Sequence, residues 1–389
     1  MRPRWIAAFL ALSLTATAPA LAQEGGPSVT IPDEPRSLRE RAALVMDHES
    51  LGPLLRAEGY RWAGNAEIYL AEIVPGAGGP ALVTYDAVQG AFSQNFWPAS
   101  SVKLLAAVAA LEHAGALGFT GAAVVDGSTY GGRTLRSIYE PAIQYSDNYA
   151  YDLLVRFAGL DFINREFLPR HGFDDATIGT TFTGLSERNS PPYTLSEWTS
   201  SGSPFPIPSY LMARLQQEDV PRRASGYYRS NNLDLFDLGE VVRRVMLHDE
   251  LPAAERFALD GRYVAALQEV LCISEPAHYR AGSITEWGEG VEVCGKSGWW
   301  DRTAEPEEEA GDEGEEEEPV ALPPACTDVA LISDPLTGRR VLLGATGGCY
   351  GGGLPGLAGP ALRASAALPG GTPLQPDGGL PMKVTLRAV

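Results

Sequence analysis

Apolar and polar positions along the chain predict strands at both ends and helices between them. Ala66 to Val74 and Ala81 to Tyr85 are apolar runs joined by a loop of Pro and Gly, a pattern typical of a hairpin. Strand-like runs return at 291–295, 328–333 and 340–345. We therefore expect one antiparallel sheet of about five strands, built by the two ends of the chain together.

Segments with helical spacing lie mostly between these strands. The run from Leu104 to Phe119 is apolar but contains Glu112 and His113, which indicates a buried helix. Helices are expected at 36–58, at about 100–114, and at 149–157, 235–247, 262–271 and about 360–367. The predicted fold class is α+β: an antiparallel sheet flanked by helices, with an inserted all-helical region.

Residues 1–22 have the pattern of a cleavable secretory signal peptide. Arg2 and Arg4 precede an apolar stretch from Ile6 to Leu14, and small residues follow at 20–22. This stretch is shorter than the ~20 apolar residues that a spanning helix needs. We predict a secreted or periplasmic protein without stable membrane insertion after signal cleavage.

The mature chain is expected to form one main domain and a tail. The domain covers 23–368, with its sheet part at about 36–98 and 285–368 and its helical part at about 100–284. A tail rich in Gly and Pro follows at 369–389.

Acidic residues outnumber basic ones by 49 to 30, and ten of the acidic ones fall between Glu305 and Glu318. Such a block repels itself, so we predict a disordered insertion at 303–320. The block lacks the spacing of a calcium loop. The acidic balance argues against a nucleic-acid partner, because phosphate contacts need clustered Lys and Arg. The five His residues lack zinc-ligand spacing, so no metal or cofactor is predicted.

Four cysteines, Cys272, Cys294, Cys326 and Cys349, allow three disulfide pairings. A metal site is the alternative, but no C-x-x-C motif occurs. Cys326 and Cys349 bracket a predicted hairpin, so they are candidates to pair, which would join Cys272 to Cys294. An exported protein permits such bonds.

Three short motifs carry the candidate chemistry: Ser100-Ser101-Val102-Lys103, Ser146-Asp147-Asn148 and Lys296-Ser297-Gly298. Three residues apart on a helix, Ser100 and Lys103 share a face. The amine can then take the serine proton if desolvation or another cation lowers its pKa. Ser146 is a candidate proton relay, and Asn148 a candidate ligand for a substrate amide. Taken alone, the first two motifs also fit ordinary helix caps and turns.

The third motif ends an apolar strand. On an edge strand, Lys296 and Ser297 can bind a carboxylate, and Gly298 lets a substrate backbone lie close. Residues 290–297 also match the phosphate-loop pattern G-x-x-x-x-G-K-S. That pattern must follow a strand and open a helix, whereas here it is itself the predicted strand. No G-x-S-x-G nucleophile elbow is present.

In this order the motifs resemble those of the serine β-lactamases and penicillin-binding proteins, over about residues 36–368, and the sequence around Ser146 resembles class A β-lactamases. The resemblance implies that Ser100 attacks a small-molecule β-lactam or a peptidoglycan peptide. Lys103 would be the base, and Ser146 would pass the proton to the leaving nitrogen. The backbone N–H groups of Ser100 and Trp299 would hold the oxyanion.

The chain departs from class A enzymes in the loop that resolves the acyl-enzyme. Those enzymes carry an E-x-x-L-N motif whose Glu activates water, and this motif is missing between residues 148 and 233. Glu187, Glu197 and Glu218 lie in a long predicted loop at 179–232 without that flanking pattern. Asp152 stands where class A enzymes usually have Asn.

Substrate binding also departs from the family, because residues 326–333 lack the Arg that often contacts the substrate carboxylate. The leading hypothesis is an exported β-lactamase-like serine hydrolase. The alternatives are a D,D-peptidase or penicillin-binding enzyme with slow deacylation, and a non-catalytic binding protein of the same fold.

Overall fold

The computed structural model describes residues 47, 49–62, 66–76, 79–88, 96–119, 123–126, 129–160, 162–173, 176–183, 194–198, 204–207, 231–274, 277–300, 325–348, 354 and 356–368. The predicted signal peptide, the acidic block at 303–320 and the tail at 369–389 lie outside these residues. All the described residues belong to one compact unit, Arg36–Val389.

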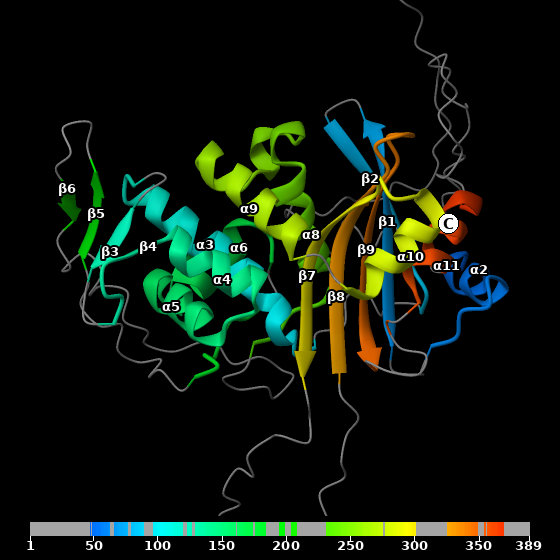
Figure 1. Cartoon of the computed structure of the whole chain (residues 1–389), viewed down its shortest axis with the longest axis horizontal. Helices are drawn as coiled ribbons and strands as arrows, with labels where there is room; N and C mark the ends of the chain where they lie inside the picture. The colour runs from blue at the N-terminus through cyan, green and yellow to red at the C-terminus, as the bar shows by residue number, and fades with distance from the viewer. Residues whose placement is uncertain are drawn as a thin grey trace, which may run out of the picture. The chain divides into compact units, whose positions relative to one another are not determined.

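A five-stranded antiparallel sheet forms the centre of this unit, as predicted, in the order β2-β1-β9-β8-β7 (Figure 1). Both ends of the chain build it, because β1 pairs with β9 and places Leu70 opposite Leu343. The edge strand β7 begins at Glu292 and runs through the third motif to Trp300, well past the predicted end of this strand, so the Gly-Lys-Ser residues of the phosphate-loop pattern lie inside a strand and open no helix. The phosphate-loop interpretation is therefore wrong. The strands are β1 (Glu67–Gly76), β2 (Gly79–Asp86), β7 (Glu292–Trp300), β8 (Ala325–Ser333) and β9 (Arg340–Gly348).

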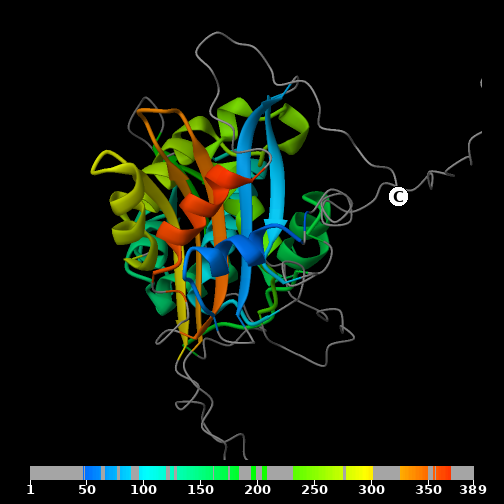
Figure 2. The same ribbon diagram turned by 90° about the vertical axis from the view of Figure 1, so that its right-hand side faces the viewer.

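Helices cover both faces of the sheet, so its strands are buried on both sides. On one face, α8 (Leu235–Met246) packs on β1, β8 and β9, and α9 (Gly261–Ile273) packs on β7. On the other face lie α2 (Leu51–Ala57), α10 (Ala277–Trp287) and α11 (Ala358–Ala367) (Figure 2). Successive residues of β1 therefore enter different cores: Tyr69 packs on the α8 side and Leu70 on the α11 side.

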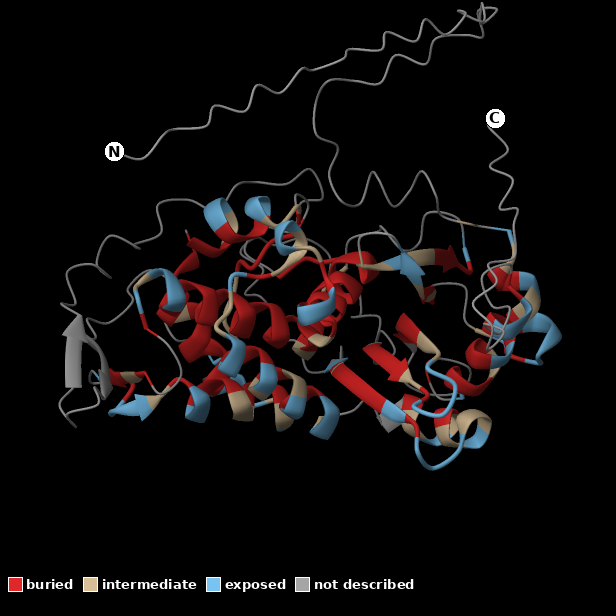
Figure 3. Cartoon of the chain, turned by 90° about the horizontal axis from the view of Figure 1, so that it is seen from above, coloured by how far each residue is buried: buried red, intermediate tan, exposed pale blue. Residues whose placement is uncertain are grey.

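The helical part is built around α3 (Val102–Ala116), which is buried continuously from Val102 to Ala114. A helix that is apolar on all sides needs neighbours on all sides. Helices α4, α5 and α8 supply them, and Figure 3 colours this region mostly as buried. The remaining elements are η2 (Ala99–Ser101), α4 (Arg136–Gln144), α5 (Asn148–Ala158), the π-helical turn η3 (Phe162–Phe167), α6 (Leu168–Arg170), η4 (His248–Glu250) and η5 (Ala253–Glu255).

The inserted region is not all-helical, contrary to the prediction. A second antiparallel sheet has the order β4-β3-β5-β6 and consists of β3 (Val124–Asp126), β4 (Arg133–Thr134), β5 (Thr194–Trp198) and β6 (Pro204–Ile207). Such short strands carry too few residues for a recognisable alternation. β6 is an edge strand, where Pro is tolerated, so its prolines suggested a loop instead.

A disulfide bond joins a helix to the edge strand of the central sheet. Cys272 of α9 is bonded to Cys294 of β7, which confirms one predicted pairing. Cys326 is also disulfide-bonded, and its predicted partner Cys349 lies outside the described residues. Among the described residues, no helix is long and apolar enough to cross a bilayer.

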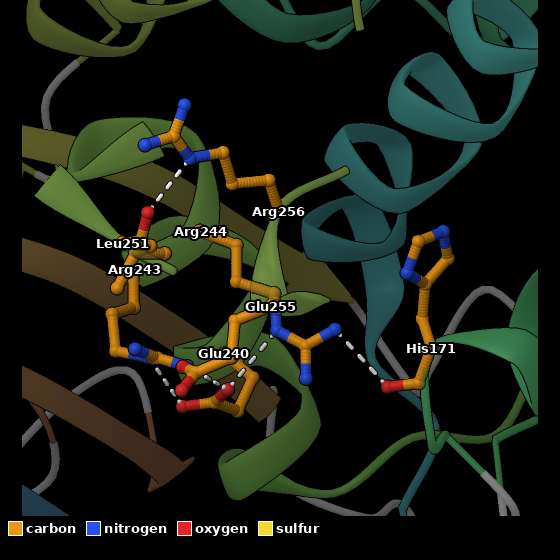
Figure 4. A network of polar contacts seen from close by, with 7 residues as sticks. All are labelled: His171, Glu240, Arg243, Arg244, Leu251, Glu255 and Arg256. Carbon is orange, nitrogen blue, oxygen red and sulfur yellow. Dashed lines mark hydrogen bonds and ion pairs between the residues drawn. The ribbon is translucent and has the colours of Figure 1, made fainter. Parts of the chain in front are cut away.

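A buried ionic network lies on α8, drawn in Figure 4. Glu240 accepts two hydrogen bonds of 2.8 Å from Arg243 and one of 3.2 Å from Arg244. Arg243 also pairs with Glu255, and Arg244 donates to the carbonyl oxygen of His171. Burial acts to raise the pKa of Glu240, but the two arginines outweigh it and the pKa is lowered. The network therefore links α8 to the segment after α6 as an ionised cluster.

Candidate active site

Ser100 lies on a tight 3-10 turn that leads into α3. Ser101 closes this turn by donating its backbone N–H and its hydroxyl to the carbonyl oxygen of Pro98, at 3.1 and 2.5 Å. Ala99 has a φ of 48°, a left-handed conformation that is uncommon for a residue with a Cβ. Strain of this kind is found mainly where a functional geometry requires it. The turn places the predicted nucleophile, half-buried, at the start of a rigid helix.

Lys103 is fully buried one helical turn after Ser100. Its Nζ donates to the carbonyl oxygen of Ser146 and, at 2.6 Å, to Oδ1 of Asn148. Burial and the nearby charge of Lys296 lower the pKa of Lys103 from 10.5 to about 7, against a weaker opposing effect of two aspartates. The first two motifs are therefore joined through the amine, and this amine is neutral in part of the molecules near neutral pH.

The second motif lies between α4 and α5, where Ser146 has a φ of 56°. Asp147 caps α5 by accepting a hydrogen bond of 2.8 Å from the backbone N–H of Ala150. This residue therefore has the ordinary capping role that the turn reading of the motif predicts. Whereas the carbonyl oxygen of Ser146 binds Lys103, its hydroxyl accepts a hydrogen bond of 2.9 Å from Nζ of Lys296.

Lys296 of β7 is buried, with 4% of its surface exposed. Its Nζ also donates to the carbonyl oxygen of Ser297 at 2.7 Å. Burial lowers the pKa of Lys296 to about 8, although Asp328 acts in the opposite direction. Asp328 lies opposite Ser297 on β8 and is fully buried. Sequence reasoning noted only that this strand lacks an Arg and missed the carboxylate beside the third motif.

Gly298 is where β7 meets the Ser100 turn. A Cβ at this position would lie 2.6 Å from the carbonyl oxygen of Pro98 and 3.1 Å from the backbone nitrogen of Ser100. Any side chain would therefore push the third motif away from the first. The glycine is required by this contact within the protein, whereas the sequence suggested only room for substrate.

The strand geometry also places the backbone N–H of Trp299. In an antiparallel strand, the N–H and C=O of one residue point the same way and alternate along the chain. The carbonyl oxygens of Gly295 and Ser297 accept hydrogen bonds from the side chains of Ser274 and Lys296. These contacts indicate that both carbonyl groups point away from β8. The N–H of Trp299 accordingly points away from β8, on the edge that carries the Ser100 turn. The Trp299 side chain is 56% exposed.

Asp152 has a role that the sequence did not reveal. Its carboxylate accepts backbone N–H groups from Phe182 at 2.7 Å and Thr183 at 2.8 Å, and it also binds the Thr183 hydroxyl. The carboxylate thereby fixes the end of the segment 176–183, and the Phe182 ring lies over Lys103, with Nζ 5.2 Å from its centroid. A motif search has no means of finding this contact.

Of the three glutamates in the predicted loop, the structure describes one. Glu197 lies on β5 of the second sheet, whereas Glu187 and Glu218 lie outside the described residues. Within the described part of the chain, no group of three or more His, Cys, Asp or Glu side chains is arranged to hold a metal ion.

Comparison with known proteins finds similarity in structure only. No family model and no curated protein matches the sequence. Among solved structures, PBP-A is 14% identical with a TM-score of 0.49, over 83% of this chain and 98% of that chain. A class A β-lactamase from Bacteroides cellulosilyticus is 15% identical with a TM-score of 0.47, over 81% and 97% of the two chains. A class A β-lactamase from Mycobacterium abscessus has the same identity and TM-score, over 81% and 98%.

The three motifs come together at one edge of the central sheet. A sheet made from both chain ends is flanked by helices, and the three motifs converge where β7 meets η2 and the α4–α5 turn. This architecture, an antiparallel sheet of five strands built by both ends of the chain and flanked by helices, is the one that the sequence predicted.

Proposed function

We propose that the chain is an exported serine hydrolase that forms an acyl-enzyme through Ser100, with β-lactams as acyl donors. The observation that carries this proposal is the hydrogen bonding of Lys103. A neutral amine has two N–H groups and one lone pair. Its two N–H groups are directed to Ser146 and Asn148, so the lone pair remains for the proton of Ser100 on the same helix face.

In the proposed acylation step, Ser100 Oγ bonds to the carbonyl carbon while its proton passes to Lys103. The oxyanion is held by the backbone N–H groups of Ser100 and Trp299. Removing one such donor typically costs about 3–4 kcal/mol of transition-state stabilisation. The C–N bond then breaks, and the proton reaches the leaving nitrogen through Ser146. This serine can donate its hydroxyl proton because Lys296 already supplies the hydrogen bond that it accepts.

The third motif is proposed to bind the substrate carboxylate. Lys296 supplies the positive charge and Ser297 a hydroxyl on the same strand. Asp328 beside them reduces the net positive charge of this region. We expect substrate affinity to be lower than a site with an unopposed lysine would have. The side-chain NH₂ group of Asn148, whose Oδ1 accepts from Lys103, is proposed to bind the substrate amide.

One observation favours the alternative of a D,D-peptidase or penicillin-binding enzyme with slow deacylation. Hydrolysis of the acyl-enzyme needs a water activated by a base. Beside Lys103, the described residues place the ring of Phe182 and an Asp152 carboxylate that already accepts two backbone N–H groups. Both candidates share the acylation step and differ in the lifetime of the acyl-enzyme.

The proposed location outside the cytoplasm is supported by the Cys272–Cys294 disulfide and by the signal-like pattern of residues 1–22. Expressing the full chain with a C-terminal tag and determining the N-terminus of the secreted product tests this. Cleavage after Ala22 is the expected result, and an uncleaved product retained in the cytoplasm would contradict it.

Intact-mass spectrometry with a labelled penicillin, together with turnover of a chromogenic cephalosporin, tests the function. We expect a covalent adduct or rapid turnover with the wild type and neither with Ser100→Ala. Ser137→Ala is the control, because this exposed serine of α4 donates its hydroxyl to the carbonyl oxygen of Thr134, away from the three motifs. Lys103→Met should stay folded and react far more slowly. An unlabelled wild type with every β-lactam and D-Ala-D-Ala peptide tried would favour the non-catalytic alternative.

A further inference from the structure

One residue beside Lys103 has no part in the acylation steps. The face of the Phe182 ring lies toward the amine, with Nζ 5.2 Å from the ring centroid. An ammonium group is attracted to such a face, so the ring tolerates a protonated lysine. It provides no oxygen or nitrogen that would hold a water molecule by a conventional hydrogen bond.

Phe182 is held in place from several directions. Its ring stacks on Tyr151 at 4.6 Å and meets Trp97 edge-on at 5.9 Å. Its backbone N–H is bound by Asp152 at 2.7 Å, and the Tyr151 hydroxyl binds the carbonyl oxygen of Thr180 at 3.0 Å. Trp97 comes three residues before Ser100, so this aromatic wall extends from α5 to the nucleophile turn.

We propose that Phe182 is a positioning residue that keeps water away from Lys103 in the acyl-enzyme, so that the Ser100 ester hydrolyses slowly. This inference rests on the proposed function, because it concerns the fate of the acyl-enzyme. Access to Nζ is restricted by Ser146 on one side, Asn148 on another and the Phe182 ring on a third. The ring is the one member of this set that offers no polar atom.

The step that the ring prevents is a base-assisted hydrolysis. The Lys103 lone pair takes a proton from water as the water oxygen bonds to the acyl carbon. The tetrahedral intermediate then collapses, the bond between the acyl carbon and Ser100 Oγ breaks, and Lys103 returns the proton to Oγ. A water molecule must lie beside both Nζ and the ester for this to occur.

A variant that admits this water should show the titration of Lys103. Among the described residues, the charged groups that act on the amine are Lys296 from β7, Asp147 at the cap of α5 and Asp152 within α5. Their combined effect, with burial, leaves the pKa of Lys103 at about 7. Hydrolysis that uses its lone pair should therefore accelerate as the pH rises through this value. A purely structural role for Phe182 would not produce such a profile.

The test labels wild type, Phe182→Leu and Phe182→Ser with penicillin, removes free ligand and follows loss of the adduct by intact mass. Phe182→Leu retains an apolar side chain and is the matched control. We expect long-lived adducts in both of these apolar forms. Phe182→Ser should lose its adduct about 10- to 100-fold faster, at or just below the roughly 100-fold lower end of the range for a positioned base, because this base did not evolve for the step. Its rate should rise between about pH 6 and 8.

Circular dichroism and melting curves establish whether each variant is folded. If Phe182→Ser does not fold, Phe182→Gln takes its place as the polar variant. Equal adduct lifetimes in the wild type and the folded polar variant would overturn the inference, as would rapid hydrolysis by the wild type. If the wild type forms no adduct at all, the proposed function fails first and the inference falls with it.

Discussion

Replacing Lys296 by Met is expected to raise the pH at which Ser100 becomes reactive. The ammonium groups of Lys103 and Lys296 are bound to opposite ends of Ser146, one to its carbonyl oxygen and the other to its hydroxyl. Each charge therefore disfavours the other, and this repulsion is one cause of the lowered pKa of Lys103. Without Lys296, Lys103 should hold its proton to a higher pH.

The size of the effect follows from Coulomb's law. Two unit charges ~6 Å apart at an effective dielectric constant of about 20 repel by about 3 kcal/mol, which corresponds to about 2 pKa units. Relaxation and water entry at the vacated position reduce this, so we expect a rise of about one to two units. The pKa of Lys103 should move from about 7 to about 8–9.

The assay is the limiting rate of covalent labelling by penicillin at saturating concentration, measured as a function of pH. At saturating penicillin, weaker binding of the substrate carboxylate no longer limits the rate. The pH profile then reports the protonation of Lys103 alone. Lys296→Arg retains the charge and should keep the wild-type midpoint. An unchanged midpoint in Lys296→Met, or an equal shift in both variants, would refute the assignment of Lys103 as the base under the influence of Lys296.

Four other outcomes are expected. In the wild type, the second-order labelling rate should rise through about pH 7 as Lys103 loses its proton and fall above about pH 8 as Lys296 does, giving a bell-shaped profile. Gly298→Ala should reduce labelling and lower the unfolding free energy by about 1–3 kcal/mol, because its Cβ meets Pro98 and Ser100; urea melts that match the wild type would contradict this. Glu240→Ala should cost about 3–5 kcal/mol, because it leaves the buried Arg244 without a carboxylate partner and Arg243 with Glu255 alone, whereas Glu140→Ala, at an exposed pair, should cost far less. Reducing the Cys272–Cys294 disulfide, which closes a loop of 22 residues, should cost about 3 kcal/mol, measurable as a lower melting temperature.

The sequence predicted the parts of the site that depend on local pattern. The spacing placed Lys103 one helical turn after Ser100, where the structure has it, and the apolar runs at both chain ends correctly predicted a shared sheet. Phe182 was not predicted, because its contact with Lys103 depends on where Asp152 fixes a segment thirty residues away. The full length of β7 was also not predicted. Its second half contains polar residues and glycine, which have low strand propensity, and Gly298 is required there by the close contact with η2.

The pairing of β1 with β9 has a consequence for how the protein assembles. Residues 67–73 find their partners at 340–346, so the centre of the sheet forms only after residue 346 has been synthesised. Closing a loop of this length makes folding slow relative to helix formation. The contact between Gly298 and the Ser100 turn depends on that late step, because β7 joins the sheet through β8 and β9. Covalent labelling of Ser100 would then count molecules that have completed folding, and its appearance over time would report the last stage of assembly directly.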